Sequence, residues 1–212
     1  MVQLPPIPDR IAKLPRDKRG YPVPWFVMWI DGEPKFPIAD YRKRAQAVNE
    51  NLCWVCGDVM GANKAFVIGP MCGVNRTTAE PPAHLECALF SVKACPFLNN
   101  PNQKRIPTEG SSPGGIMIER NPGVNLIWVT RQYTLFSPAP KEWLIHIGVP
   151  TQIQFWKEGR PATKKEVLAA IEAGCPAVEK IAKKHGEMEE FLAAKNGFLT
   201  ILNALPAFAC NP

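Results

Sequence analysis

The sequence predicts an α+β fold, with a β-hairpin near the N-terminus, a cysteine-rich module, a small antiparallel sheet and C-terminal helices. Runs of aromatic and β-branched residues alternate with Pro or Gly between residues 115 and 159, which indicates strands. Helix-capping residues follow, and an apolar run before Asp31-Gly32 indicates a hairpin. The 212 residues are 46% hydrophobic and 21% charged, which is typical of a folded globular protein.

The N-terminal segment and the hairpin come first. Residues 1–24 are rich in proline, so we expect them to lie extended over the surface or to hang free. The stretch WFVMWIDGEPKF (25–36) predicts a hairpin that turns at Asp31-Gly32. Its return strand is expected to be shortened by Pro37, since proline cannot donate a ladder hydrogen bond.

A helix is predicted over ADYRKRAQAVNEN (39–51). Asp40 is the expected N-cap, because its short side chain can accept a hydrogen bond from a free backbone N–H of the first turn. Tyr41, Ala45 and Val48 recur at helical spacing and are expected to lie on one side of this helix.

The second half of the chain predicts three or four antiparallel strands followed by helices. The expected strands are GIMIER (115–120), NLIWVTRQYTLF (125–136), EWLIHIG (142–148) and TQIQFWKEG (151–159). Two further helices are expected at about 177–185, ending at Gly186, and at 187–205.

The first helix of this half lies within GRPATKKEVLAAIEAGCP (159–176). Thr163 and Glu166 have the spacing of a capping box, and Gly174 suits the position just past a helix C-terminus. Val167, Leu168 and Ile171 form the predicted buried stripe.

Composition divides the chain into four segments. NNPNQKRIPTEGSSPGG (99–115) is rich in Asn, Pro, Ser and Gly, and is the clearest internal boundary. The predicted units are the extended segment 1–24, the hairpin, helix and metal module 25–98, the loop 99–115, and the strands and helices of 116–212.

Two short cysteine motifs predict one metal site. Cys53 and Cys56 have C-x2-C spacing, which lets both sulfurs turn to one side of a tight turn, and Gly57 can adopt the positive φ that completes it. His84 and Cys87, in PPAHLEC (81–87), fall on one face of a helix that Pro81-Pro82 is expected to start. These four residues are the predicted ligands of a zinc ion.

Alternatives to this ligand set remain open. Cys72 could replace His84, and Cys95 could join the site if the helix ends early at Pro96. The thiols could also be buried as small hydrophobic groups. A redox role for Cys53 and Cys56 lacks the βαβ context of thioredoxin-like proteins.

Residues 51–95 resemble the treble-clef family of zinc fingers, through the CWVCG turn, a predicted short hairpin at 58–70 and a helix whose first turn carries the second ligand pair. The resemblance implies a structural zinc ion, because four protein ligands leave no open position for water. Some treble clefs are HNH-type nucleases with a general-base histidine, and the corresponding stretch 65–82 contains none.

Most of the chain is also similar to a group of bacteriophage and actinobacterial proteins of no known activity. The resemblance lies in the segments YPVPWFVMWIDG (21–32), LCWVCG (52–57), FVIGPMCGVNRTTAEPPAHLECALFSVKACPFL (66–98) and GRPATKKEVLAAIEAGCP (159–176). It implies a phage or bacterial origin and supplies no catalytic residue.

Charge and motifs leave two classes of function. The net charge of +6 and the clusters around Arg42, Lys43 and Arg44, with Arg76 and Lys93, favour binding of DNA or RNA. The alternative is a protein-interaction or host-regulatory role, for example against a host defence, in which zinc is purely structural. No dinucleotide-binding, P-loop or nucleophile-elbow motif is present, so a non-enzymatic protein is expected.

Aromatic composition and targeting signals complete the sequence-based expectations. Most of the 6 tryptophans are expected in the core, with base stacking as the alternative role. No secretory signal or long apolar run is visible, which predicts a cytoplasmic protein, in the bacterial host cell if phage-encoded, with no membrane partner. The reducing cytoplasm favours metal binding over disulfides for the 7 cysteines.

Overall fold

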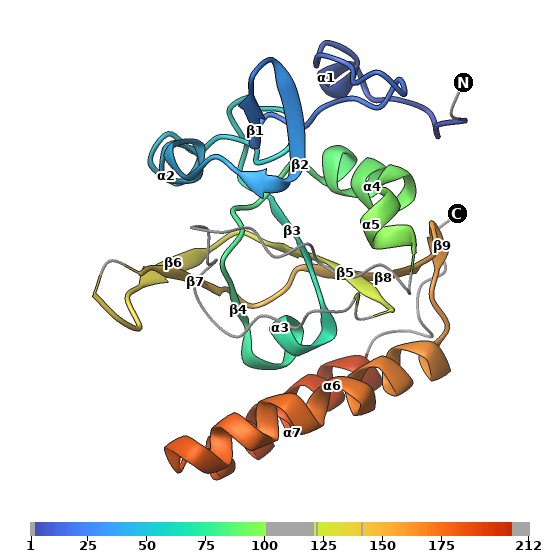
Figure 1. The fold of residues 1–212 in the computed structure, drawn as a ribbon. Coiled ribbons are helices and arrows are strands. Elements are labelled where there is room, and N and C mark those ends of the chain that lie inside the picture. The colour runs from blue at the N-terminus through green and yellow to red at the C-terminus, as the bar shows by residue number, and fades with distance from the viewer. Residues whose placement is uncertain (1–2, 101–120, 122, 141, 205–212) are drawn as a thin grey trace.

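The computed structural model describes residues 3–100, 121, 123–140 and 142–204, and its mixed helices and antiparallel sheets confirm the α+β class (Figure 1). The helices are α1 (Asp9–Ala12), α2 (Tyr41–Asn49), α3 (Pro70–Asn75), α4 (Leu85–Ala94), α5 (Pro96–Asn99), α6 (Lys164–His185) and α7 (Met188–Ala204). The strands are β1 (Val27–Ile30), β2 (Glu33–Ala39), β3 (Lys64–Ile68), β4 (Thr77–Thr78), β5 (Asn125–Thr130), β6 (Tyr133–Phe136), β7 (Leu144–Ile147), β8 (Gln152–Lys157) and β9 (Arg160–Pro161). The predicted strand 115–120 and most of the loop 99–115 lie outside the described residues.

The described strands form three antiparallel sheets, with orders β1-β2, β3-β5-β8-β9 and β4-β7-β6. The predicted hairpin within 58–70 is wrong. Strand β3 pairs with β5, so that Phe66 lies opposite Trp128. Residues before β3 instead complete the cysteine turn, where Leu52 and Val59 form an isolated bridge.

Both faces of the four-stranded sheet are covered, and the alternation of side chains explains how. Phe66, Leu126 and Trp128 belong to the largest core cluster, which includes the buried residues of α6 and α7. Their neighbours Ala65 and Ile127 point the other way, into a cluster that contains residues of α4. Figure 1 shows α6 and α7 side by side below the sheet and α4 above it.

The long helix α6 begins as predicted and ends later than predicted. Thr163 and Glu166 form both hydrogen bonds of the capping box. Gly174 does not end the helix, which continues past Pro176 to His185. A Cβ atom at Gly174 would lie 2.7 Å from Cγ of Met71 in α3, so this glycine allows close packing of two helices.

Helix α6 joins the helix expected within 159–176 to the one expected at about 177–185, and Leu168 of the predicted stripe is only half-buried. Gly186 follows α6 with φ 74°, as expected of a left-handed C-cap. Val167 and Ile171 are fully buried, and the stripe continues through Cys175 to Ala182.

The predicted hairpin is formed by β1 and β2, and Asp31 and Gly32 both have positive φ at its turn. The prediction that Pro37 shortens the return strand is wrong, since β2 runs to Ala39. The two strands form a sheet of their own, and the register shifts between Val27 and Met28, so that proline is tolerated near the irregularity.

Helix α2 has the predicted N-cap, and of the three residues expected on one side of it only Val48 packs against the core. The Asp40 side chain accepts a hydrogen bond from the backbone N–H of Arg42. Arg44 and Ala47 are buried, whereas Tyr41 and Ala45 are exposed. The amphipathic pattern was misleading because a charged residue, Arg44, takes the inward position by bonding to backbone carbonyl groups.

Candidate metal centre

The structure brings the four predicted ligands together. Atoms that Cys53, Cys56, His84 and Cys87 can offer to a metal ion all lie within 4.8 Å of one another. Cys53 and Cys56 occupy the turn between α2 and β3, while His84 is the N-cap of α4 and Cys87 lies in its first turn. The cluster is therefore made by a tight turn and a helix N-terminus, as the motif spacing predicts.

The turn that carries Cys53 and Cys56 depends on Gly57. The N–H of Gly57 donates to the carbonyl of Cys53 at 2.8 Å, and Gly57 has φ 80°. A Cβ atom there would also lie 2.8 Å from the indole ring of Trp25, which covers the turn. Only glycine satisfies both the backbone conformation and the close approach of the ring.

The helix that carries Cys87 begins later than predicted. Pro81-Pro82 lie ahead of α4, whose N-cap is His84 in an extended conformation. The carbonyl of Pro82 accepts a hydrogen bond from the Trp54 N–H at 2.9 Å, and Ala83 bridges to Ala65. The two prolines thus join the cysteine turn and β3 to the start of α4, rather than starting the helix themselves.

The separation of the ligand atoms fits a small tetrahedral ion. Bond lengths of about 2.3 Å to sulfur and about 2.0 Å to nitrogen place two sulfurs about 3.8 Å apart, and a sulfur and a nitrogen about 3.5 Å apart. The Sγ of Cys56 lies 3.4 Å from Nδ1 of His84. This distance, and the 4.8 Å limit on all the others, are compatible with a zinc-sized ion.

Groups around the cluster orient its ligands. With Nδ1 of His84 facing Cys56, the Nε2–H donates to the carbonyl of Val59 at 3.2 Å. Such a partner fixes the ring and the tautomer of a metal-binding histidine. The backbone N–H groups of Cys56 and His84 donate to Sγ of Cys53 at 3.4 and 3.3 Å. These contacts stabilise a thiolate.

The chemistry of the three thiols also favours binding of a cation. Hydrogen bonds from the Cys56 and Cys87 thiols hold the pKa of Cys53 far below its ordinary value. The same contact with Cys53 raises the pKa of Cys56 to about 11, and contacts with Cys53 and Cys56 raise that of Cys87. A divalent ion would favour the thiolate form of all three cysteines, because metal binding requires deprotonated sulfur ligands.

The N-terminal segment packs over this centre instead of hanging free, and it contains α1 where an extended chain was expected. Ile11 is buried against a small cluster that includes the three ligand cysteines. Lys13 and Arg10 pair with Asp58 at 2.6 and 3.2 Å, and Arg10 also pairs with Glu86. Sequence analysis missed these pairs, because partners separated by 45 residues or more leave no local signal.

The two alternative ligands lie elsewhere. Cys72 is in α3 and packs against the largest core cluster. Cys95 caps α5, and its pKa is raised by burial. Neither belongs to the ligand cluster found among the described residues.

The predicted contact residues are dispersed and mostly engaged within the protein. Arg44 is buried, stacks 3.5 Å over Trp143 and donates to the carbonyl groups of Ala79 and Trp143, so its contribution is structural. Arg76 donates to the carbonyl of Ile147. Lys93, on α4, lies over the ring of Trp156, far from α2 in Figure 1.

Arg42 and Lys43 keep a more open position on α2. The Arg42 side chain is 87% exposed and pairs with Asp40 at 3.1 Å. Lys43 lies 5.5 Å over the ring of Trp25 and donates to the Trp25 carbonyl. Lys43 is thereby connected to the cysteine turn through Trp25, which packs on Gly57.

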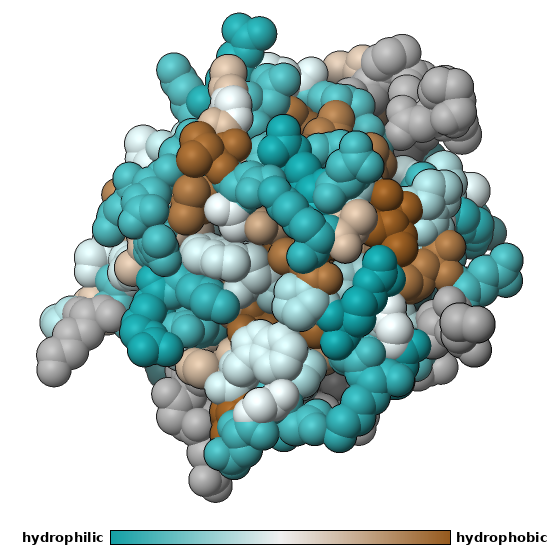
Figure 2. Space-filling model, turned by 90° about the horizontal axis from the view of Figure 1, so that it is seen from above, coloured by the Kyte–Doolittle hydropathy of each residue, from teal (hydrophilic) through white to brown (hydrophobic). Residues whose placement is uncertain are grey.

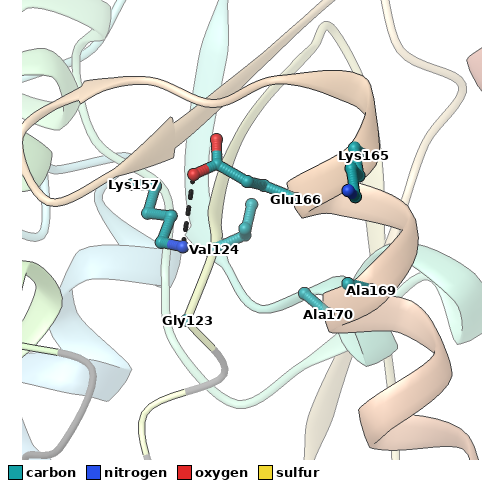
Figure 3. Close-up of a pocket in the computed structure, with 7 residues that line it drawn as sticks. All are labelled: Gly123, Val124, Lys157, Lys165, Glu166, Ala169 and Ala170. Carbon is teal, nitrogen blue, oxygen red and sulfur yellow. Dashed lines mark ion pairs between the residues drawn. The ribbon is translucent and has the colours of Figure 1, made fainter.

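A cavity of about 340 Å³ near the start of α6 is a separate feature. Gly123, Val124, Ala169 and Ala170 line it, and Figure 3 shows Glu166 joined to Lys157 beside it. Glu166 pairs with Lys157 at 3.2 Å and with Arg160 at 2.7 Å, and Lys165 also lines the cavity. The cavity therefore presents little chemistry of its own.

The two histidines outside the ligand cluster lie on a strand and on a helix. His146 lies on β7, and burial and the charge of Arg76 lower its pKa. His185 is in the last turn of α6.

Among the described helices, none combines the length and apolar character needed to cross a bilayer.

Comparisons with known proteins find no match among family models, curated proteins or solved structures. The resemblance to bacteriophage and actinobacterial proteins receives no support from them. The function must be argued from the site itself.

Proposed function

We propose that this chain is a zinc-stabilised protein that binds nucleic acid without catalysing a reaction. The ion is zinc because three thiolates and an imidazole form a soft, four-coordinate donor set. Four protein ligands leave no position for a catalytic water, so the ion stabilises the fold. The role of the protein then lies in the surface that the ion rigidifies.

We further infer that residues 51–95 form a variant of the treble-clef finger. The cysteine turn and the ligand pair at the start of α4 support this relationship. The hairpin that usually separates the two ligand pairs is replaced here by β3, which pairs with β5 in the central sheet. The metal module is thereby joined to the rest of the fold.

One observation carries the nucleic-acid assignment. The indole ring of Trp25 packs on Gly57 beside the metal ligands, and Lys43 lies over the same ring. The backbone N–H of Trp25 also donates to the carbonyl of Val55 in the cysteine turn. Metal binding thus holds a cationic and aromatic surface in place, which is the combination that nucleic-acid binding uses.

The assignment is tested by fluorescence anisotropy of labelled 20-nucleotide DNA and RNA, single-stranded and duplex, from 50 to 300 mM NaCl. We expect binding that weakens steeply with salt, since phosphate contacts release counterions. A chelator should abolish the binding. Absence of binding to every oligonucleotide at 50 mM NaCl would contradict the proposal.

A protein partner is the second candidate, and one observation favours it. Leu135 and Phe136 on β6, an edge strand of the described β4-β7-β6 sheet, are 48% and 40% exposed. Exposed apolar residues at a sheet edge suit an added strand from another protein. A host-regulatory role belongs to this candidate, and a pull-down from bacterial lysate with a Phe136→Ala control tests it.

A further inference from the structure

The β1-β2 hairpin and the segment before it expose aromatic rings that do not pack into the core of the protein. Trp29 is 41% exposed, and Phe36 and Tyr21 are partly exposed. None of these rings belongs to the three core clusters formed by the described residues. Because Trp29 pairs with Pro34 and alternate residues of a strand share a face, Trp29, Pro34 and Phe36 lie on one side of the hairpin.

Cationic side chains accompany these rings. The Arg19 guanidinium lies 5.1 Å from the centre of Tyr21 and 5.7 Å from that of Phe36, so it joins the N-terminal segment to the hairpin. Lys18 pairs with Glu33 at 2.6 Å, and its side chain is 84% exposed. Rings that accept cations on their faces are also the surfaces on which nucleobases stack.

The local charge is positive even after its acidic groups are counted. Asp17 pairs with Arg19, and Asp40 pairs with Arg42. Apart from the buried Arg44, the basic residues between positions 16 and 44 are Arg16, Lys18, Arg19, Lys35, Arg42 and Lys43, and the acidic ones are Asp17, Asp31, Glu33 and Asp40. This excess complements a phosphate backbone.

Figure 2 looks down on this end of the molecule. Hydrophilic and intermediate residues cover most of the face, and strongly apolar residues form separate small patches. A large protein-docking surface would show a contiguous apolar patch instead. The surface therefore favours a ligand that combines flat rings with negative charge.

We propose that the hairpin face formed by Arg19, Tyr21, Trp29 and Phe36 is a stacking platform for single-stranded nucleic acid. The bases stack on the exposed rings, and Arg19 contacts the phosphates. A duplex hides the faces of its bases, so it cannot use this platform. This inference rests on the proposed function and names its ligand class and its contact surface.

The test measures anisotropy of a labelled 20-nucleotide oligothymidylate, the matching oligouridylate and a 20-base-pair duplex at 50 mM NaCl. Trp29→Ala should weaken single-strand binding by at least about fivefold, the loss expected for one stacked base. Phe136→Ala removes a ring of nearly equal exposure, 40%, on another sheet and should leave binding unchanged. Equal DNA and RNA affinities would indicate stacking without recognition of the 2′-hydroxyl.

A second variant guards against loss of folding. The Arg19 side chain is 59% exposed, so Arg19→Ala should keep the fold and the metal content while weakening binding and reducing its salt dependence. Circular dichroism and metal analysis of each variant check that the fold is intact.

The outcomes separate this inference from the proposed function. Oligonucleotide binding that survives both Trp29→Ala and Arg19→Ala would keep nucleic-acid binding and overturn the platform. Equal binding of duplex would overturn the single-strand assignment. Binding of no oligonucleotide would overturn both proposals, as would a lysate protein retained by the wild type and lost with Trp29→Ala in place of nucleic acid.

Discussion

The metal-centred region and the sheet–helix region achieve order by different means. The sheet–helix region buries a large set of aliphatic and aromatic side chains on β3, β5 and β8 against α6 and α7. The cluster around the metal ligands is much smaller, and three of its eight buried residues are the ligand cysteines themselves. Burial of apolar side chains is sufficient to explain the order of the sheet–helix region. The metal-centred region buries few apolar side chains, and we expect a bound ion to stabilise it.

The two regions also differ in how the chain is held. Regular ladders connect β3, β5 and β8, so each strand is supported by its neighbours. Around the metal centre, order comes from a tight turn, isolated bridges and the short helix α1. Loss of the ion should therefore disturb the second region first, and the predictions below use that contrast.

The largest effect is expected from Cys53→Ser. A structural zinc ion supplies on the order of 10 kcal/mol of folding free energy, and loss of a central thiolate should remove much of it. We expect loss of metal, measured by inductively coupled plasma mass spectrometry, and loss of cooperative unfolding in the N-terminal half. Cys175→Ser is the matched control, because it places a hydroxyl in the apolar core and should cost about 1–3 kcal/mol with full metal content.

The next effect tests the other region. Ile171 is 1% exposed within the largest core cluster, and Ile171→Ala should lower the free energy of unfolding by about 2–5 kcal/mol. Urea denaturation provides the value. Metal content should stay at the wild-type level, and its loss would show that the two regions do not respond separately.

A pair of glycines sharpens the account of helix packing. Gly174→Ala should destabilise the protein by about 1–3 kcal/mol, since the added Cβ meets the Met71 side chain. Gly197, inside α7, has open space around it, and Gly197→Ala should stabilise by about 0.5–1 kcal/mol. Thermal unfolding of both variants measures the difference, and changes of the same sign would contradict the packing.

The smallest effect concerns Glu166. Hydrogen bonding from Arg160, and then from the Thr163 N–H, holds the pKa of this carboxyl far below its ordinary 4.5. The carboxylate therefore contributes stability above about pH 4.5, and the contribution disappears as the pH falls through the lower folded-state pKa. Glu166→Gln should cost about 1 kcal/mol or less at pH 7, because its ionic partners are largely exposed.

The difference between wild type and Glu166→Gln should shrink on acidification below about pH 4.5, in unfolding curves measured at several pH values. Glu190→Gln, on the exposed side of α7, serves as the control. A difference that grows with acid would contradict the capping interaction.

Local features of this molecule could be predicted from the sequence, and long-range ones could not. The cysteine turn, the Asp31-Gly32 turn and the Thr163–Glu166 cap each depend on residues within a few positions of one another. The partner of β3 was missed because β5 lies about 60 residues away in the chain and both strands are simply apolar.

Two other errors have the same physical origin. Gly174 has the composition of a helix end, but tertiary contact with Met71 decides its role. Arg44 was assigned to the surface because of its charge, although two backbone carbonyls and the ring of Trp143 satisfy it in the interior. Of the candidate site, the ligands were predictable, and the covering ion pairs with Asp58 were not.

Hydrogen exchange before and after removal of metal by a chelator tests the central claim most directly. We predict that one zinc ion per chain is released. Amide protection should then fall at the cysteine turn, α1 and the start of α4, while β5, β8 and α6 remain protected. Unchanged protection around Cys53 and Cys87 in metal-free protein, or a preparation from native cells without bound metal, would contradict the account.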